Sequence, residues 1–190
     1  MDEKAVHELI RKKQAEDSIR QEFEGTLADR VARYLEVKPH EIVPYTHFSA
    51  ISAECSLLFR DGHYYGCIAL TQAVAEALVR FLCTKNTFKP VKKFEENVRK
   101  LSTRTFISDK VKESLLKIWE GRDDYHHLNT SIENDRQTLE ELAREKTRLL
   151  VEVERDVFRF TIVDGKINPE NRKYWDISSD QMQVFLRLDP

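Results

Sequence analysis

The sequence contains few residues that interrupt helices. Only five glycines and five prolines occur in 190 residues, while apolar residues make up 41% and charged residues 34% of the chain. A composition poor in turn-forming residues and rich in charge favours a helical bundle over a β-sandwich or a β-barrel. The length is that of one domain, with or without extensions, and it suffices for a substantial hydrophobic core.

Cysteines are also scarce. Cys55, Cys67 and Cys83 are the three in the chain, and no two of them form a CxxC pair. An odd number of cysteines argues against a disulfide framework. Each one lies among apolar residues, so we interpret all three as small buried side chains.

The chain lacks an excess of positive charge and a long apolar run. Its formal net charge of −2 excludes a broadly basic surface, so a polyanion would have to be held by a local basic patch. No apolar run approaches 18 residues, and the first four residues resemble neither a signal peptide nor a transit peptide. We therefore expect a soluble, cytoplasmic protein that does not enter a membrane.

Hydrophobic periodicity divides the chain into three parts. An N-terminal helical extension is predicted over residues 1–47, a helical bundle over 48–158, and a tail with possible short strands over 159–190. The fold class that follows is all-α, with an antiparallel bundle at its centre. The predicted helices cover residues 2–24, 26–36, 49–60, 64–83, 94–101, 109–120 and 138–158.

Local signals mark several of these boundaries. Asp61-Gly62 predicts the end of a helix, and Ser108 is a typical helix N-cap. Thr138 and Glu141 have the spacing of a capping box that would open the last long helix. Two prolines, at positions 39 and 44, predict a connection before the bundle, and the apolar runs 158–163 and 184–188 predict strands in the tail.

Chemically reactive side chains gather at residues 121–129, between two predicted helices. Residues five apart on a continuous α-helix lie about 140° apart, so Arg122 and His127 would need a helix start or an irregular turn to share one face. Gly121 makes such a break plausible. The nine residues are Gly121-Arg122-Asp123-Asp124-Tyr125-His126-His127-Leu128-Asn129.

Three interpretations of this segment follow from its residues. It can be a polar loop with exposed histidines, and it can be a metal site. Zinc is a poor choice, because adjacent histidines diverge, no cysteine is close in sequence, and an aspartate would have to complete the site. The third is RNA strand scission, in which histidine transfers a proton near neutral pH and arginine holds the phosphate.

One such set of residues supplies only one group for proton transfer. A homodimer that brings two sets together would be chemically more complete, and a two-fold axis makes this arrangement easy. Gln72 and Glu76 lie four residues apart on a predicted helix and therefore share one face. They either belong to an exposed polar stripe or support the segment at 121–129.

The segment resembles the R-x4–6-H motif of HEPN domains, compact helical domains found in many prokaryotic ribonucleases, toxins and phage-defence proteins. Arg122 and His127 match the two fixed positions, and Asp123 matches the polar residue that commonly follows the arginine. The predicted hairpin at 51–83 is similar to the first two helices of that family, and the resemblance covers residues 48–158.

The resemblance implies a metal-independent endoribonuclease without a cofactor, acting on RNA at a composite site between two subunits. His127 would act on the 2′-hydroxyl or the leaving oxygen, Arg122 would hold the scissile phosphate, and Asp123 would orient its neighbours. His126 is a further candidate for assistance. Asn129 stands where many toxins of the family have tyrosine, which places modification of that residue by a partner enzyme in doubt.

Two functions therefore remain open. The first is an RNA-cleaving enzyme, for example a toxin or defence effector with an antitoxin or another regulatory partner. The second is a non-catalytic helical module that binds a protein or a nucleotide.

Overall fold

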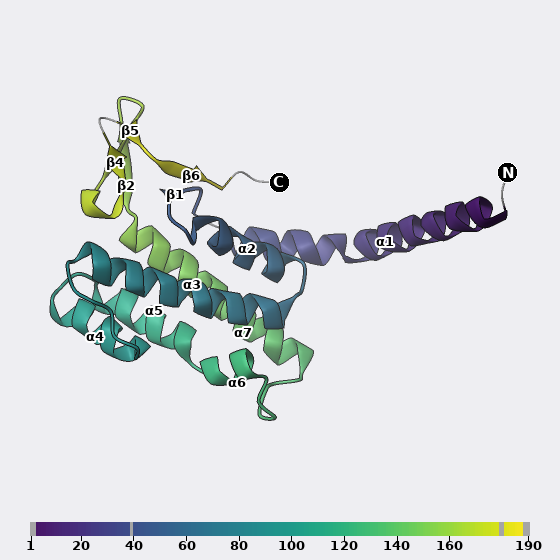
Figure 1. Cartoon of the computed structure of the whole chain (residues 1–190), viewed down its shortest axis with the longest axis horizontal. Coiled ribbons are helices and arrows are strands. Elements are labelled where there is room, and N and C mark those ends of the chain that lie inside the picture. Colours follow the sequence, from purple (N-terminus) through teal and green to yellow (C-terminus); the bar gives the residue numbers. More distant parts are fainter. Residues whose placement is uncertain (1–2, 39, 179–180, 188–190) are drawn as a thin grey trace.

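The computed structural model of the chain describes residues 3–38, 40–178 and 181–187, and most of these residues are helical. The central helices form a bundle, and short paired strands lie beyond one end of it (Figure 1). The prediction of an all-α fold with a strand-bearing tail is confirmed. The helices are α1 (Glu3–Glu36), α2 (Ser49–Arg60), α3 (Tyr64–Lys85), α4 (Phe94–Thr103), α5 (Asp109–Trp119), α6 (Arg122–His127) and α7 (Arg136–Val157).

Helix α3 is the centre of the bundle, because it contacts α2, α4, α5, α6 and α7. By length and mean hydropathy alone, α3 is also apolar enough to cross a membrane. The search for an unbroken apolar run does not reveal this, because polar residues interrupt the helix. Slightly more than half of its apolar window is buried inside the bundle, which accounts for the composition. The expected cytoplasmic location stays a prediction.

The core consists of two clusters of buried side chains. The larger cluster joins α3, α4, α5 and the second half of α7, and it includes Cys55 and Cys83. The smaller cluster joins the end of α2 and the start of α3 to α7 and contains Cys67 and Tyr125. All three cysteines are free and buried, which confirms their interpretation from the sequence.

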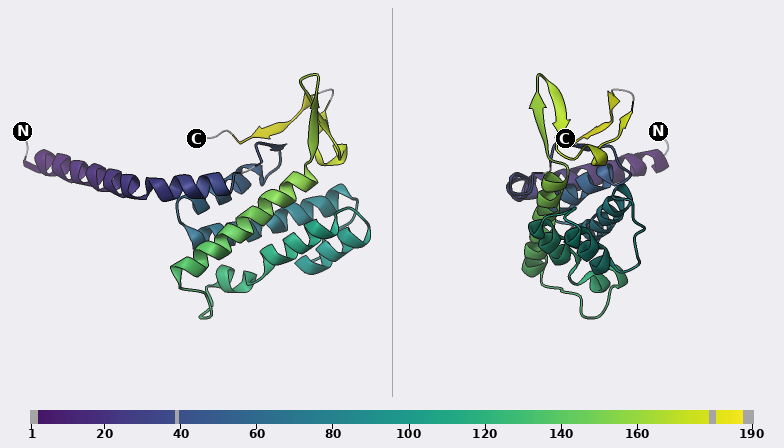
Figure 2. Two further views of the ribbon diagram at one scale, coloured as in Figure 1. Left: turned by 180° about the vertical axis from the view of Figure 1, so that it is seen from behind. Right: turned by 90° about the vertical axis from the view of Figure 1, so that its left-hand side faces the viewer.

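Helix α1 projects from the bundle as a single long helix (Figure 2). The prediction of two helices, separated at Gly25, is therefore wrong. A β-carbon at Gly25 would meet nothing within 4 Å, and one glycine in an exposed helix costs only about 1 kcal/mol relative to alanine. The strong helix formers on both sides outweigh that cost.

The base of α1 is attached to the bundle by arginines. Arg33 Nε donates to the carbonyl of Arg60 at 2.9 Å, and Arg30 Nε lies 3.7 Å from Asp61 Oδ1. No residue of α1 is buried. Eight of its large apolar side chains are exposed, namely Val6, Leu9, Ile10, Ile19, Phe23, Leu27, Val31 and Leu35.

Two helix starts can be compared with their predicted caps. Ser108 caps α5 as predicted, because its hydroxyl accepts a hydrogen bond from the amide of Val111 at 3.2 Å. The predicted capping box of Thr138 and Glu141 is wrong. Asp135 is the N-cap of α7, and its carboxylate accepts from the amide of Thr138 at 2.8 Å, so the helix begins two residues earlier than expected.

The strands form three small antiparallel pairs. β2 pairs with β3 through a turn at Asp164-Gly165, where both residues have positive φ, and β4 pairs with β5. β6 does not pair with the first strand of the tail but with β1, which lies in the connection before the bundle. Pro39 and Leu188, which belong to predicted features, lie outside the described residues. The strands are β1 (Ile42–Pro44), β2 (Phe160–Val163), β3 (Lys166–Pro169), β4 (Ile177–Ser178), β5 (Gln181–Met182) and β6 (Val184–Leu186).

Candidate functional site

The candidate site begins where α5 ends. Gly121 has a φ of +69°, a left-handed conformation that glycine adopts without steric cost. This turn directs the chain at once into α6, and the carbonyl of Gly121 accepts from the amide of Asp124 at 3.1 Å. Arg122 is consequently the first residue of a new helix, and His127 is its last.

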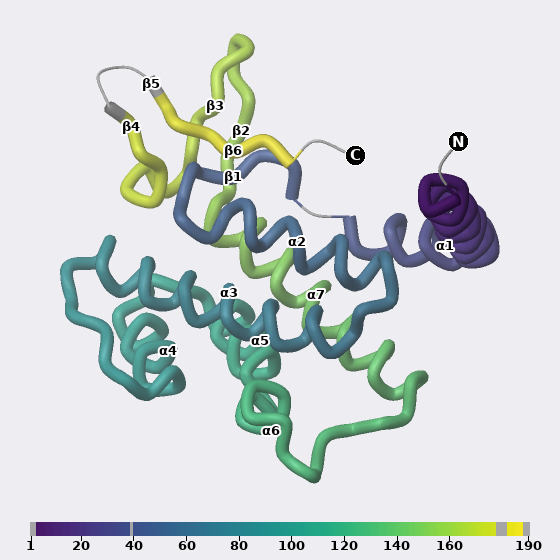
Figure 3. The backbone as a smooth tube through the Cα atoms, turned by 45° about the vertical axis from the view of Figure 1, so that its right-hand side comes forward, coloured from purple at the N-terminus to yellow at the C-terminus, as the bar shows by residue number. Residues whose placement is uncertain are grey.

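Helix α6 is held against the bundle by Tyr125. The Tyr125 side chain is buried in the smaller core cluster, and its ring lies 6.4 Å from the ring of Tyr65 on α3. Leu128 ends the helix in a left-handed conformation, with a φ of +50°, and its side chain is exposed. One buried ring therefore fixes a short helix whose other side faces solvent, beside the long loop to α7 (Figure 3).

Arg122 and His127 meet on this exposed side. Arg122 Nη1 lies 3.4 Å from His127 Nε2 and 3.0 Å from Asp123 Oδ1. The break at Gly121 and the helix start at Arg122 are those that the sequence indicates, and the long arginine side chain reaches from the first residue of the six-residue helix to His127 at its end. The structure thus brings together Arg122, Asp123 and His127, which the sequence singles out.

The surroundings of Arg122 leave part of its guanidinium available. The side chain is 29% exposed and its Cζ lies 5.5 Å from the centroid of the Trp119 ring. Its Nε is buried without a hydrogen-bond partner among the described residues. Asp123, by contrast, is 77% exposed, so its contact with Arg122 is a surface ion pair that contributes little to stability.

Asp124 and Asn129 order the loop that follows α6. Asp124 Oδ1 accepts from Ser131 Oγ at 2.7 Å and from Asn129 Nδ2 at 3.2 Å. These two hydrogen bonds, with that of Ser131 the larger effect, lower the pKa of the Asp124 carboxyl. Asn129 therefore supports the site through the loop and forms no hydrogen bond with Arg122 or His127 among the described contacts.

His126 is an exposed residue of α6 whose pKa is influenced by the backbone at Ala69 and by the charge of Glu76, both on α3. Burial and then the charge of Arg122 lower the pKa of His126, and these effects outweigh the two that raise it. Glu76 forms an ion pair of 2.6 Å with Arg80, so it belongs to the surface of α3 beside the site.

Gln72 is fully buried, which contradicts the expected exposed stripe. Its Nε2 donates to the carbonyls of Ile118 and Glu120, both at 3.1 Å. These carbonyls lie at the end of α5, directly before Gly121. Gln72 thus supports the segment at 121–129 by holding the backbone directly before it, which is the supporting role considered for this residue from the sequence.

Lys146 is the supporting residue that sequence analysis missed. Its side chain lies on α7, the residue is 2% exposed, and Nζ donates to the carbonyls of Lys117, Ile118 and Glu120 at 3.0, 2.8 and 2.8 Å. An ammonium group at these carbonyls satisfies the free acceptors of a helix end and complements its dipole. Burial lowers the pKa of Lys146 to about 8, so the group is still protonated at neutral pH.

A signal for Lys146 is present in the sequence. The buried positions of α7 recur at helical spacing and include Leu139, Ala143, Leu150 and Val157. Lys146 occupies a position of this same series, where an apolar residue is expected. A lysine in the core register of a helix predicts a buried cation with a specific acceptor.

Within the described part of the chain, no group of three or more histidine, cysteine, aspartate or glutamate side chains is arranged to hold a metal ion. Comparisons with protein-family models, with curated proteins and with solved structures find no match for this chain. The resemblance of residues 48–158 to HEPN domains consequently stays a prediction.

Proposed function

We propose that the protein cleaves RNA by metal-independent transesterification at Arg122 and His127. The observation that carries this proposal is the contact of 3.4 Å between Arg122 Nη1 and His127 Nε2 on an exposed helix. A phosphate-binding cation and a proton-transferring imidazole are thereby adjacent, and solvent reaches both side chains. One subunit thereby supplies a phosphate-binding cation and one of the two proton-transfer groups used when a ribose hydroxyl attacks its neighbouring phosphate.

In the proposed reaction the 2′-oxygen loses its proton and bonds to phosphorus, while the bond from phosphorus to the 5′-oxygen breaks. The products are a 2′,3′-cyclic phosphate and a 5′-hydroxyl, and the leaving oxygen receives a proton. His127 performs one of these proton transfers, and Arg122 neutralises the charge of the crowded phosphate. Asp123 restrains the guanidinium through its contact of 3.0 Å.

The second proton transfer requires another group. The proposed homodimer supplies it by bringing two copies of α6 together, and the exposure of His126, His127 and Leu128 leaves this surface open for a second copy. Sedimentation of the full chain measures the association. A dimer is expected, whereas a strict monomer would leave the site without its second proton-transfer group.

The direct test is incubation of RNA with the purified protein in EDTA. Arg122→Ala and His127→Ala should each reduce cleavage by at least about 100-fold, as expected for loss of a phosphate ligand or a general acid–base group. Arg148→Ala and His7→Ala serve as matched controls, because both residues are exposed on other helices. Equal activity in all five proteins would exclude Arg122 and His127 as the catalytic pair.

A non-catalytic binding module is the second candidate, and α1 favours it. This 34-residue helix has no buried residue and exposes eight large apolar side chains, which suits attachment to a protein partner such as an antitoxin or another regulator. The same RNA assay separates the two candidates, since a module of this kind leaves RNA intact.

A further inference from the structure

A depression in the surface lies directly beside Arg122. It has a volume of about 420 Å³, and its lining includes Glu95 of α4, Trp119 of α5, and Arg122 and Asp124 of α6. This volume is within the range of about 300–1,000 Å³ typical of small-molecule sites. The proton transfers of the proposed reaction do not need this depression, and its lining residues indicate what it binds.

One wall of the depression is a fixed aromatic ring. The partly exposed indole of Trp119 stacks on the buried ring of Phe94, with centroids 4.1 Å apart and an angle of 12° between the planes. The backing by Phe94 holds the orientation of the indole. Phe94 thus occupies one face of the indole and the Arg122 guanidinium lies 5.5 Å from the ring centroid, so the surface offered to an unstacked nucleobase is the exposed part of the indole together with the guanidinium plane.

Arg122 supplies the positive end of the depression. Its guanidinium lies over the Trp119 ring, and Nη1 is the terminal nitrogen that contacts Asp123 and His127. Nη2 has no hydrogen bond among the described residues and remains available to a ligand. A phosphate at this nitrogen would lie beside His127, while the group attached to it would enter the depression.

Carboxylates supply the remaining polarity. Glu95 is exposed and forms no hydrogen bond or ion pair among the described residues, and it faces the depression from a different helix than Arg122. Asp124 also lines the depression, with Oδ1 occupied by Ser131 and Asn129. Negative charge keeps phosphate out of the depression and accepts hydrogen bonds from N–H groups.

We propose that this depression binds the guanine base of the nucleotide whose phosphate contacts Arg122, with Glu95 as the residue that recognises it. The inference rests on the proposed RNA cleavage and names its substrate preference. Guanine alone presents a ring N–H and an adjacent amino group, which together donate two parallel hydrogen bonds to one carboxylate. Adenine, cytosine and uracil each offer only one donor nitrogen on that edge.

The test is titration of the isotopically labelled full chain with each of the four nucleoside 3′-monophosphates in EDTA, followed by the NMR signals of the indole N–H groups. Trp119 should shift, and the buried Trp175 serves as the internal reference. The guanine nucleotide should bind at least about tenfold more tightly than the others, because hydrogen bonds to a charged acceptor are the strong ones.

Glu95→Gln should remove this preference without affecting the fold, since the side chain is exposed. Glu113→Gln is the matched control, because Glu113 is an exposed glutamate on α5 that does not line the depression. Trp119→Leu should abolish binding, which in this variant is followed by the backbone amide signal of Arg122, and an otherwise unchanged backbone spectrum would show that the fold survives. Equal affinity for the four nucleotides, or an unchanged preference in Glu95→Gln, would overturn the inference.

The inference and the proposed function can fail separately. Binding of the guanine nucleotide at Trp119 without cleavage of any RNA would support the depression as a guanine site and contradict the nuclease. Cleavage of RNA at all four bases, without a shift of the Trp119 signal, would contradict the guanine site and leave the nuclease in place.

Discussion

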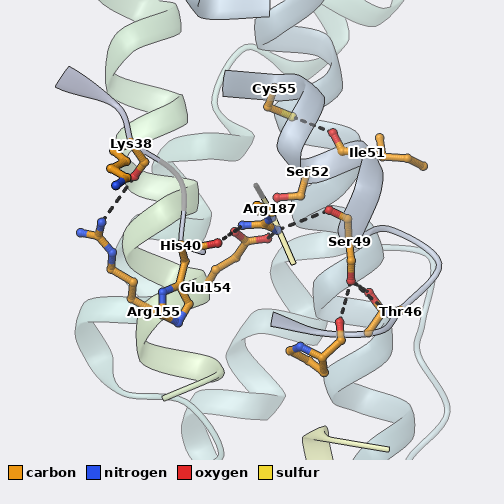
Figure 4. A network of polar contacts seen from close by, with 11 residues as sticks. Lys38, His40, Thr46, Ser49, Ile51, Ser52, Cys55, Glu154, Arg155 and Arg187 are labelled. Atoms are coloured by element: carbon orange, nitrogen blue, oxygen red, sulfur yellow. Dashed lines mark hydrogen bonds and ion pairs between the residues drawn. The ribbon is translucent and has the colours of Figure 1, made fainter. Parts of the chain in front are cut away.

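Two arginines, Arg122 of α6 and Arg187 after β6, illustrate how differently one side chain can be used. Arg187 follows β6, is almost fully buried, and binds Glu154 through two hydrogen bonds, from Nη1 at 2.6 Å and from Nη2 at 2.9 Å (Figure 4). Ser52 donates to the same carboxylate at 2.6 Å. Arg122 is partly exposed and shares only Nη1 with its neighbours.

The difference lies in the terminal nitrogens, since the Nε of both arginines is buried without a hydrogen-bond partner in the part of the chain that the structure describes. At Arg187 both terminal nitrogens are engaged by protein, so the residue fixes the tail and β1 against the bundle. At Arg122 one terminal nitrogen is left for a ligand. The comparison indicates that Arg187 contributes to stability and Arg122 to binding. Replacing Arg187 by alanine should mainly lower the stability, and replacing Arg122 by alanine should mainly lower the activity.

The largest effect on stability is expected from Arg187→Ala. Removing one partner leaves the buried Glu154 carboxylate without its counter-charge, which lowers the free energy of unfolding by about 3–5 kcal/mol. Arg122→Ala should change it by less than about 1 kcal/mol, because its ion pair is at the surface. Urea denaturation of both variants measures the contrast, and a large loss in Arg122→Ala would contradict it.

A smaller loss is expected from Lys146→Met. The substitution keeps a long side chain but leaves the carbonyls of Lys117, Ile118 and Glu120 with fewer donors, which should lower the free energy of unfolding by about 1–3 kcal/mol. Cleavage of RNA should also fall, since these carbonyls precede Arg122. Lys117→Met, at an exposed lysine of α5, is the control and should leave both quantities unchanged.

Replacing the entire buried network should have the smallest net effect. A triple variant combines Arg187→Met, Glu154→Leu and Ser52→Ala. It removes both charges of the ion pair and the hydroxyl that donates to Glu154, so no charge is left unpaired. The free energy of unfolding is expected to stay within about 1 kcal/mol of the native protein or to rise. A loss as large as that of Arg187→Ala would show that the network contributes more than its paired charges.

The pH dependence of stability provides a further comparison. The pKa of Lys146 is lowered from 10.5 to about 8, so between these pH values the unfolded chain holds a proton that the native protein has released. The free energy of unfolding contributed by this group therefore rises with pH across that interval. Lys146→Met should lack this rise when both proteins are denatured by urea at pH 7.5, 9 and 10.5.

Much of the fold could be predicted because its signals are local. The end of α2 at Asp61-Gly62 and the cap of α5 at Ser108 were both identified from neighbouring residues. The pairing of β1 with β6 could not be predicted, since Val43 and Phe185 are brought together only by the packed bundle. The continuity of α1 through Gly25 was missed because a glycine is a weak obstacle where nothing packs against it.

The site divides in the same way. Arg122 and His127 could be selected from the sequence because their spacing and chemistry are evident in one segment. Their contact depends on the reach of the arginine side chain across α6, and the support from Lys146 and Gln72 depends on packing of α3 and α7 against the end of α5. Such non-local contacts leave only indirect signals, such as a lysine in a core register.

The chemical ends of the RNA fragments test the central claim most directly. Wild-type protein in EDTA should produce 2′,3′-cyclic phosphates and 5′-hydroxyls, and it should leave a fully 2′-deoxy version of the same oligonucleotide intact. Fragments with 5′-phosphates, or cleavage of the 2′-deoxy oligonucleotide, would contradict attack by the ribose hydroxyl at Arg122 and His127.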